Sequence, residues 1–107
     1  MNPRVANREQ LVARLLDRLA LDERPFVAKA IEQWHALTER EREVAELHSK
    51  SMSPKTIADE RNISASTIYT HLASVMSKTG LDQCQNREPR TLLAKTVWII
   101  NLIHPHR

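Results

Sequence analysis

Apolar residues recur at helical spacing through the middle of the chain, on two short adjacent segments. In the second segment Ile68, Leu72 and Val75 fall at positions i, i+4 and i+7, which places them on one face of a helix. The first segment carries Ile57 as its inward-facing position, between charged residues. The pattern predicts a helix, a tight turn and a second helix within residues 53–79.

Capping residues mark the ends of both predicted helices. Ser53 precedes Pro54, and Ser64 precedes the second helix; a serine hydroxyl accepts a hydrogen bond well at a helix N-terminus, where proline also fits. Asn62 and Gly80 stand where the two helices need a residue that adopts the left-handed conformation in order to stop. The boundaries of the helix pair therefore follow from local signals.

The side of helix 64–79 that lies opposite its apolar stripe has an unusual composition. It carries small, neutral, hydrogen-bonding residues, namely Ser66, Thr67, Tyr69, Thr70, Ala73, Ser74 and Ser77. A face that meets only water normally contains Glu and Lys, whereas small side chains let another surface approach closely. A helix pair with such a face on its second member is the arrangement that places a recognition helix in the DNA major groove.

The remaining periodicity predicts four more helices, over about residues 7–20, 23–35, 37–50 and 89–103. Thr38 and Glu41 form a reciprocal cap at the start of the third of these, and Asp22 is in position to cap the second. Residues 1–6 and the tail 104–107 are expected to lack regular structure. With a single glycine and no strand-like alternation, the chain reads as one all-α unit of six helices.

The terminal helices have wide apolar faces. The first carries Leu11, Val12, Leu15, Leu16 and Leu19, and the second carries Phe26, Ala30, Ile31 and Trp34. These faces either extend the core or form a dimer or partner surface, and the sequence leaves both interpretations open. The last helix has more apolar residues than one packed face needs, so we predict that it mediates dimerisation. The predicted interface residues are Leu92, Thr96, Trp98, Ile99 and Ile103.

Composition and charge add moderate constraints. The 107 residues suffice for one domain, 27% are charged and the formal net charge is +3. Residues 37–81 are nevertheless neutral, because six basic residues are matched by six acidic ones. The lone Cys84, a charged N-terminus without a signal peptide and the lack of a membrane-length apolar run predict a cytoplasmic protein.

The chain offers no set of residues for catalysis. No paired carboxylates, nucleophile with a base, or glycine-rich phosphate loop can be assembled, and His71 has no second metal ligand at i+3 or i+4. Cys84 with His104 and His106 fits no zinc spacing. We therefore predict a non-enzyme without catalytic residues, cofactor or metal.

Residues 37–103 resemble the LuxR/GerE-type helix-turn-helix domain. The resemblance rests on Leu37-Thr38-Glu39-Arg40-Glu41-Arg42-Glu43-Val44, Ser53-Pro54-Lys55-Thr56-Ile57-Ala58, Ile63-Ser64, Thr67-Ile68, His71 and Lys78-Thr79-Gly80-Leu81. It implies a four-helix bundle whose third helix enters the major groove and whose fourth commonly dimerises. Residues 1–36 would then be an N-terminal helical extension that packs on this domain or dimerises with it.

The resemblance also implies which residues contact DNA. It assigns contacts with the DNA groove to Tyr69, Thr70 and Ala73. It assigns contacts with phosphates to Lys55, Ser66, Thr67, His71 and Lys78. Ser74 is expected on the same surface. The chain departs from the family pattern at Ser51 and Asn62, where glycine is usual, and at Ala45 and Arg61, where leucine is usual. The groove positions carry no Lys or Arg, so methyl contacts to thymine and hydrogen bonds from Tyr69 replace bidentate reading of guanine.

Two functional hypotheses follow. The first is a transcription regulator that binds an inverted-repeat operator in double-stranded DNA as a homodimer, with helix 64–79 in the major groove. Because only 36 residues precede Leu37, we expect the sensory domains usual in the family to be absent. A protein partner is expected to act through the N-terminal helices. The alternative is a sigma-factor-like or antitoxin-like adaptor that keeps the helix-turn-helix scaffold and binds another regulator.

Overall fold

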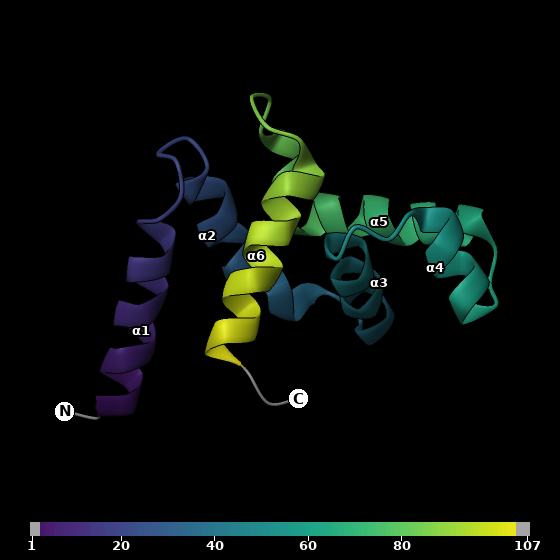
Figure 1. Cartoon of the computed structure of the whole chain (residues 1–107). Coiled ribbons are helices and arrows are strands. Elements are labelled where there is room, and N and C mark those ends of the chain that lie inside the picture. The colour runs from purple at the N-terminus through teal and green to yellow at the C-terminus, as the bar shows by residue number, and fades with distance from the viewer. Residues whose placement is uncertain (1–2, 105–107) are drawn as a thin grey trace.

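The computed structural model describes residues 3–104, with side chains from residue 9 onward. Over this range the chain is entirely helical (Figure 1), which confirms the all-α fold class. Its elements are α1 (Pro3–Leu16), α2 (Arg24–Gln33), η1 (Trp34–Ala36), α3 (Glu39–Ser49), α4 (Pro54–Arg61), α5 (Ala65–Thr79), η2 (Leu81–Gln83) and α6 (Pro89–Ile103). The predictions for residues 1–2 and 105–107 lie outside the described residues.

Helix α6 stands between the N-terminal helices and the helix-turn-helix. It packs against α1 and α2 on one side and against α3 on the other, while α5 packs on both α3 and α4. Figure 1 shows α1 and α6 running side by side in opposite directions, with α4 at the far end of the molecule. This arrangement leaves α4 and α5 together at one end.

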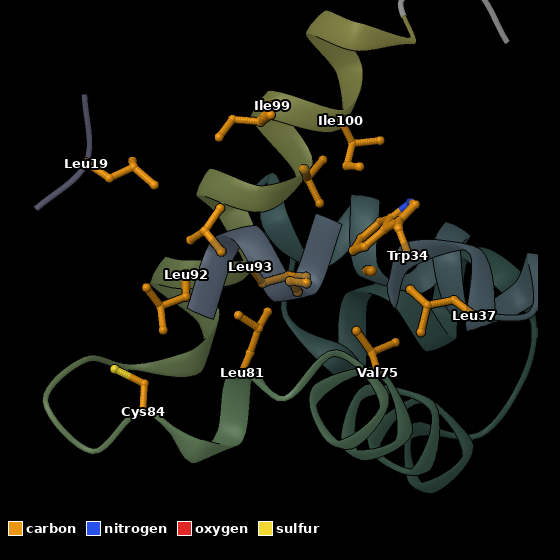
Figure 2. Close-up of a cluster of buried hydrophobic side chains, with 14 of the residues drawn as sticks. Leu19, Trp34, Leu37, Val75, Leu81, Cys84, Leu92, Leu93, Ile99 and Ile100 are labelled. Atoms are coloured by element: carbon orange, nitrogen blue, oxygen red, sulfur yellow. The ribbon is translucent and has the colours of Figure 1, made fainter. Parts of the chain in front are cut away.

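Two apolar cores hold the helices together. The smaller core joins α3, α4 and α5 through the buried side chains of Val44, Ile57, Ala58, Ile68 and Leu72. The larger one gathers residues from every helix except α4 (Figure 2), and Leu19, Trp34, Val75, Leu81, Leu93 and Ile99 are among its members. Because the burial of each large apolar side chain contributes about 1.5–3 kcal/mol, the larger core dominates the stability of the fold.

The N-terminal helices differ in their bounds from the prediction. Helix α1 begins at Pro3 and ends at Leu16, so Leu19 is buried from the following turn rather than from the helix. Asp22 does not cap α2, because Glu23 is the N-cap residue and makes no side-chain capping bond. Asp22 instead accepts hydrogen bonds from Arg87 Nε and Nη2, at 3.1 and 3.2 Å.

The N-terminal apolar faces supply part of the larger core. Leu15, Val27, Ala30 and Trp34 belong to the larger core, so these helices extend the core of the chain. Val27, which periodicity did not single out, is fully buried, whereas Leu11 remains 37% exposed.

The same packing corrects the predicted dimer interface. Leu92, Thr96 and Ile99 are completely buried within the chain. Helices α1 and α2 pack on α6, and their residues Leu15, Val27 and Ala30 share the larger core with Leu92 and Ile99. Of the five predicted residues, Trp98 is 42% exposed and Ile103 is half-buried.

A polar clamp fastens the α1–α2 turn to α6. The Glu23 carboxylate is 1% exposed; it accepts hydrogen bonds from Lys95 Nζ at 2.6 Å and from the Ala20 backbone N–H at 3.2 Å. Arg87 lies 3.5 Å from the same carboxylate. The hydrogen bond from Lys95 is the main reason that the pKa of Glu23 is lowered. This buried charge is therefore paired, as burial requires.

Ser51 and Asn62 occupy the left-handed region, with φ values of +73° and +57°. Because a side chain with a Cβ costs about 1–2 kcal/mol in this region, Ser51→Gly is expected to raise the free energy of unfolding by about 1 kcal/mol. Asn62→Gly should gain less, because Asn tolerates this conformation. Urea denaturation followed by circular dichroism measures both changes. An equal or larger gain at Asn62 would contradict the assignment of strain to Ser51.

Candidate nucleic-acid interface

The turn between α4 and α5 is built by the predicted capping residues. Ser53 Oγ accepts the N–H of Thr56 at 3.1 Å, and Ser64 Oγ accepts the N–H of Thr67 at 3.2 Å. Asn62 adopts the left-handed conformation at the end of α4. These short-range bonds satisfy backbone groups that helix ends otherwise leave unpaired, and they fix the angle at which α5 leaves the turn.

Burial of one side of α5 determines which side faces outward. Ile68 and Leu72 enter the smaller core, and Val75 enters the larger one. The opposite side therefore points to solvent. It exposes Ser66, Thr67, Tyr69, Thr70 and Ala73, of which Tyr69 is 61% exposed. His71 lies between the two sides and is half-buried.

The hydroxyl groups on this surface are ordered by bonds within α5 and its cap. Thr70 Oγ1 donates to the Ser66 carbonyl oxygen at 3.0 Å, and the Ser64 hydroxyl lies 2.8 Å from Thr67 Oγ1. Each hydroxyl oxygen retains acceptor capacity, and Tyr69 extends its phenol into solvent. The surface is thus uncharged and able to both donate and accept hydrogen bonds.

A buried carboxylate on α3 holds α5 in position. Glu41 is 5% exposed and accepts hydrogen bonds from Ser74 Oγ at 2.6 Å and from Lys78 Nζ at 2.8 Å. It also accepts the Thr38 backbone N–H at 2.8 Å, which completes the predicted capping box. Burial raises the pKa of Glu41, but the bonds from Lys78 and Ser74 outweigh it and lower the pKa to about 2.

Ser74 and Lys78 therefore have a structural role that sequence reasoning missed. Both had been predicted to lie on the DNA surface, yet their polar groups point to Glu41. Glu41 was recognisable only as a capping residue, since nothing local to it indicates partners more than thirty positions away. The structure brings the other predicted residues on α5 together on one surface.

Charges around this surface are largely paired. Arg61 lies 3.2 Å from Glu43, and Lys78 is bound to Glu41. Lys55, at the start of α4, is exposed, and no described carboxylate lies within ion-pair distance of it. Lys55 is thus available to meet an anionic partner beside an otherwise neutral face.

Within residues 3–104, no group of three or more His, Cys, Asp or Glu residues lies close enough to hold a metal ion. No helix in this range has the length and apolar character needed to cross a membrane.

Comparison with known proteins places this helix-turn-helix in context. Residues 35–86 match the model of the luxR family of bacterial regulatory proteins, GerE. A 45-residue segment is 44% identical to the transcriptional regulatory protein UhpA of Escherichia coli (strain K12). That segment is 42% of this chain but only 23% of UhpA, so most of the relative's length has no counterpart in the match. No solved structure is significantly similar to the chain.

The matched region contains α3, α4, α5 and η2, which are the elements that build the exposed neutral surface. Its capping box, its left-handed stops at Asn62 and Gly80 and its buried stripe are the features that the local sequence signals predicted. The helix-turn-helix of this chain therefore lies within residues 35–86, which match the luxR family of bacterial regulatory proteins.

Proposed function

We propose that this protein is a non-enzymatic, DNA-binding transcription regulator whose helix α5 enters the major groove. The observation that carries the proposal is the exposed, uncharged face of α5, held rigidly by its buried stripe and by Glu41. The luxR-family domain supports it, as does the similarity to a relative named as a transcriptional regulatory protein.

The exposed residues divide by the part of DNA that they would meet. Tyr69, Thr70 and Ala73 lie on the outward face and would contact base edges, with the Thr70 and Ala73 methyl groups suited to thymine. Lys55 and the hydroxyls of Ser66 and Thr67, together with His71, would contact phosphates. Because phosphate contacts carry no sequence information, the two groups should respond differently to mutation.

We further propose that the protein binds an inverted repeat as a homodimer in the cytoplasm. Two recognition helices would then lie about 34 Å apart, one turn of B-DNA. Trp98 and Leu102 support α6 as the dimer contact, because these two apolar side chains are 42% and 45% exposed and are not buried in the core of the chain. Leu92, Thr96 and Ile99 are excluded from it by their burial.

An adaptor function is the second candidate. The pairing of Arg61 and Lys78 with carboxylates favours it, because it leaves few free cations beside α5. An adaptor would bind another regulator and show no affinity for duplex DNA. Fluorescence anisotropy with a random duplex at low salt separates the two functions, since a DNA-binding protein binds any duplex under that condition.

The double variant Tyr69→Ala/Thr70→Ala tests the groove assignment. Against an operator selected from genomic fragments, it is expected to lose roughly tenfold or more in discrimination over random DNA, since each base contact is worth about 1–3 kcal/mol. Binding to random DNA should change little. Gel-shift competition between operator and random duplex measures the ratio.

Lys55→Ala is the matched control. It should weaken binding to every duplex alike and reduce the slope of log affinity against log salt by roughly one. Unchanged discrimination in the double variant would show that α5 does not read the bases.

A further inference from the structure

A cavity of about 760 Å³ opens between α1, the end of α2, η1 and the end of α6, far from the exposed face of α5. Its volume lies within the range of small-molecule sites, about 300–1,000 Å³. Its apolar walls are formed by Val12, Ile31, Trp34, Ile100 and Ile103. Trp34 and Ile100, both labelled in Figure 2, belong to the larger core and also line this cavity.

The lining includes the cation Arg42. Arg42 is half-buried, and its Nη1 donates to the Leu37 carbonyl oxygen at 3.0 Å, which orders the guanidinium. Arg42 lines this cavity and also a neighbouring surface groove that carries Glu39, Glu43 and Glu46. No carboxylate among the described residues lies within ion-pair distance of it. Glu43, the next residue on α3, forms an ion pair with Arg61.

The other polar groups at the cavity limit the charge of an occupant. Glu9 and Glu32 are exposed at its rim, and His35 is bound through Nδ1 to the Glu32 carbonyl oxygen. His104 also contributes to the lining. Two rim carboxylates disfavour a multiply charged anion, whereas the guanidinium inside offers a planar donor pair to a single carboxylate.

We propose that this cavity binds an amphipathic monocarboxylate. The carboxylate pairs with the remaining N–H groups of Arg42, and the apolar body lies against Trp34, Ile100 and Ile103. The site joins the N-terminal helices to the luxR-type domain, because α1, α2 and α6 supply its walls and α3 supplies Arg42. The proposal does not rest on DNA binding, and its test needs no duplex.

Trp34 serves as the probe in the full chain that carries Trp98→Phe, because Trp34 is then the only tryptophan. Titration with decanoate below its micelle concentration should change the emission of Trp34 and saturate. 1-Decanol and decyltrimethylammonium are matched probes with the same tail. We expect decanoate to bind at least about tenfold more tightly than either, since a charge-assisted bidentate pair is among the stronger hydrogen bonds.

Two variants localise the site. Arg42→Gln should weaken decanoate binding about tenfold, while Arg40→Gln, an exposed neighbour outside the lining, should leave it unchanged. Val12→Phe keeps the guanidinium and fills the cavity, so it should also abolish binding even if Arg42→Gln fails to fold.

The proposal would be overturned if the protein bound 1-decanol as tightly as decanoate, or if it preferred decyltrimethylammonium. It would also be overturned if Arg42→Gln and Val12→Phe both bound decanoate with full affinity. A second result would also overturn the proposal: the protein does not respond to decanoate, and Val12→Phe abolishes its dimerisation. The cavity would then be a contact with a second copy of the chain.

Discussion

Glu41→Ala is expected to lower the free energy of unfolding by about 3 kcal/mol, the lower end of the cost of breaking a buried ion pair. The substitution removes the acceptor of Ser74 Oγ, Lys78 Nζ and the Thr38 N–H at once. Lys78 keeps some access to water, with 38% of its side chain exposed, which limits the penalty. Urea denaturation at pH 7 measures the loss.

The pH dependence of stability provides a second measure of the same contact. The pKa of Glu41 is about 2 in the folded chain and 4.5 in the reference state, so its contribution is fully present above pH 4.5. As the pH falls towards 2 the carboxylate protonates and about 3 kcal/mol is lost. Glu23 and Asp22 have lowered pKa values and act in the same direction. Glu41→Gln should flatten this part of the curve.

Glu39→Ala is the matched control, because Glu39 lies on the first turn of the same helix but is exposed. It should change stability by only a few tenths of a kcal/mol, as surface substitutions do. A loss at Glu39 equal to that at Glu41, or an unchanged acid profile in Glu41→Gln, would contradict the role of Glu41 in holding α5.

A fragment of residues 37–104 is expected not to fold, although it contains the entire region that resembles the family. Its loss of α1 and α2 would uncover Leu92, Leu93 and Ile99, which are fully buried in the intact chain. At about 1.5–3 kcal/mol for each large apolar side chain, the loss rivals the whole stability of about 5–15 kcal/mol that small domains have. Far-UV circular dichroism and size-exclusion chromatography measure helicity and association.

Point variants separate lost packing from a truncation artefact. Val27→Asp places a charge at a fully buried position of α2 and should unfold the chain nearly as completely as the truncation. Leu21→Asp, in the turn before α2, changes a side chain that is 76% exposed and should leave the melting transition in place. A monomeric fragment of residues 37–104 with a cooperative melting transition would show that the extension is dispensable.

Much of the fold could be predicted because its signals are short-range. A serine or threonine cap bonds to a backbone N–H three residues away, and Asn62 and Gly80 adopt their conformations through their own covalent structure. The stripe formed by Ile68, Leu72 and Val75 likewise repeats within two turns. Helices α3 to α6 and the outward face of α5 were therefore accessible to prediction.

Contacts between distant segments were not accessible in this way. Periodicity shows that α6 is apolar on several sides, but only the packing of α1 and α2 shows that Leu92, Thr96 and Ile99 are covered and that Trp98 is left out. The expected dimer surface was too large because the helices that pack on α6, α1 and α2, lie more than fifty residues earlier in the same chain.

The amino-acid sequence by itself determined the helical fold class, the side-chain caps of α3, α4 and α5, and the family resemblance of the central domain. Each of these depends on residues within a few positions of one another. The tertiary structure alone decided that Glu41 binds Ser74 and Lys78, that Glu23 clamps Lys95, and that a cavity lies beside Arg42. The hydrogen bonds of Glu41 and Glu23 join side chains separated by 33 to 72 positions. A charged residue carries no local mark of the partner it will meet when the chain folds.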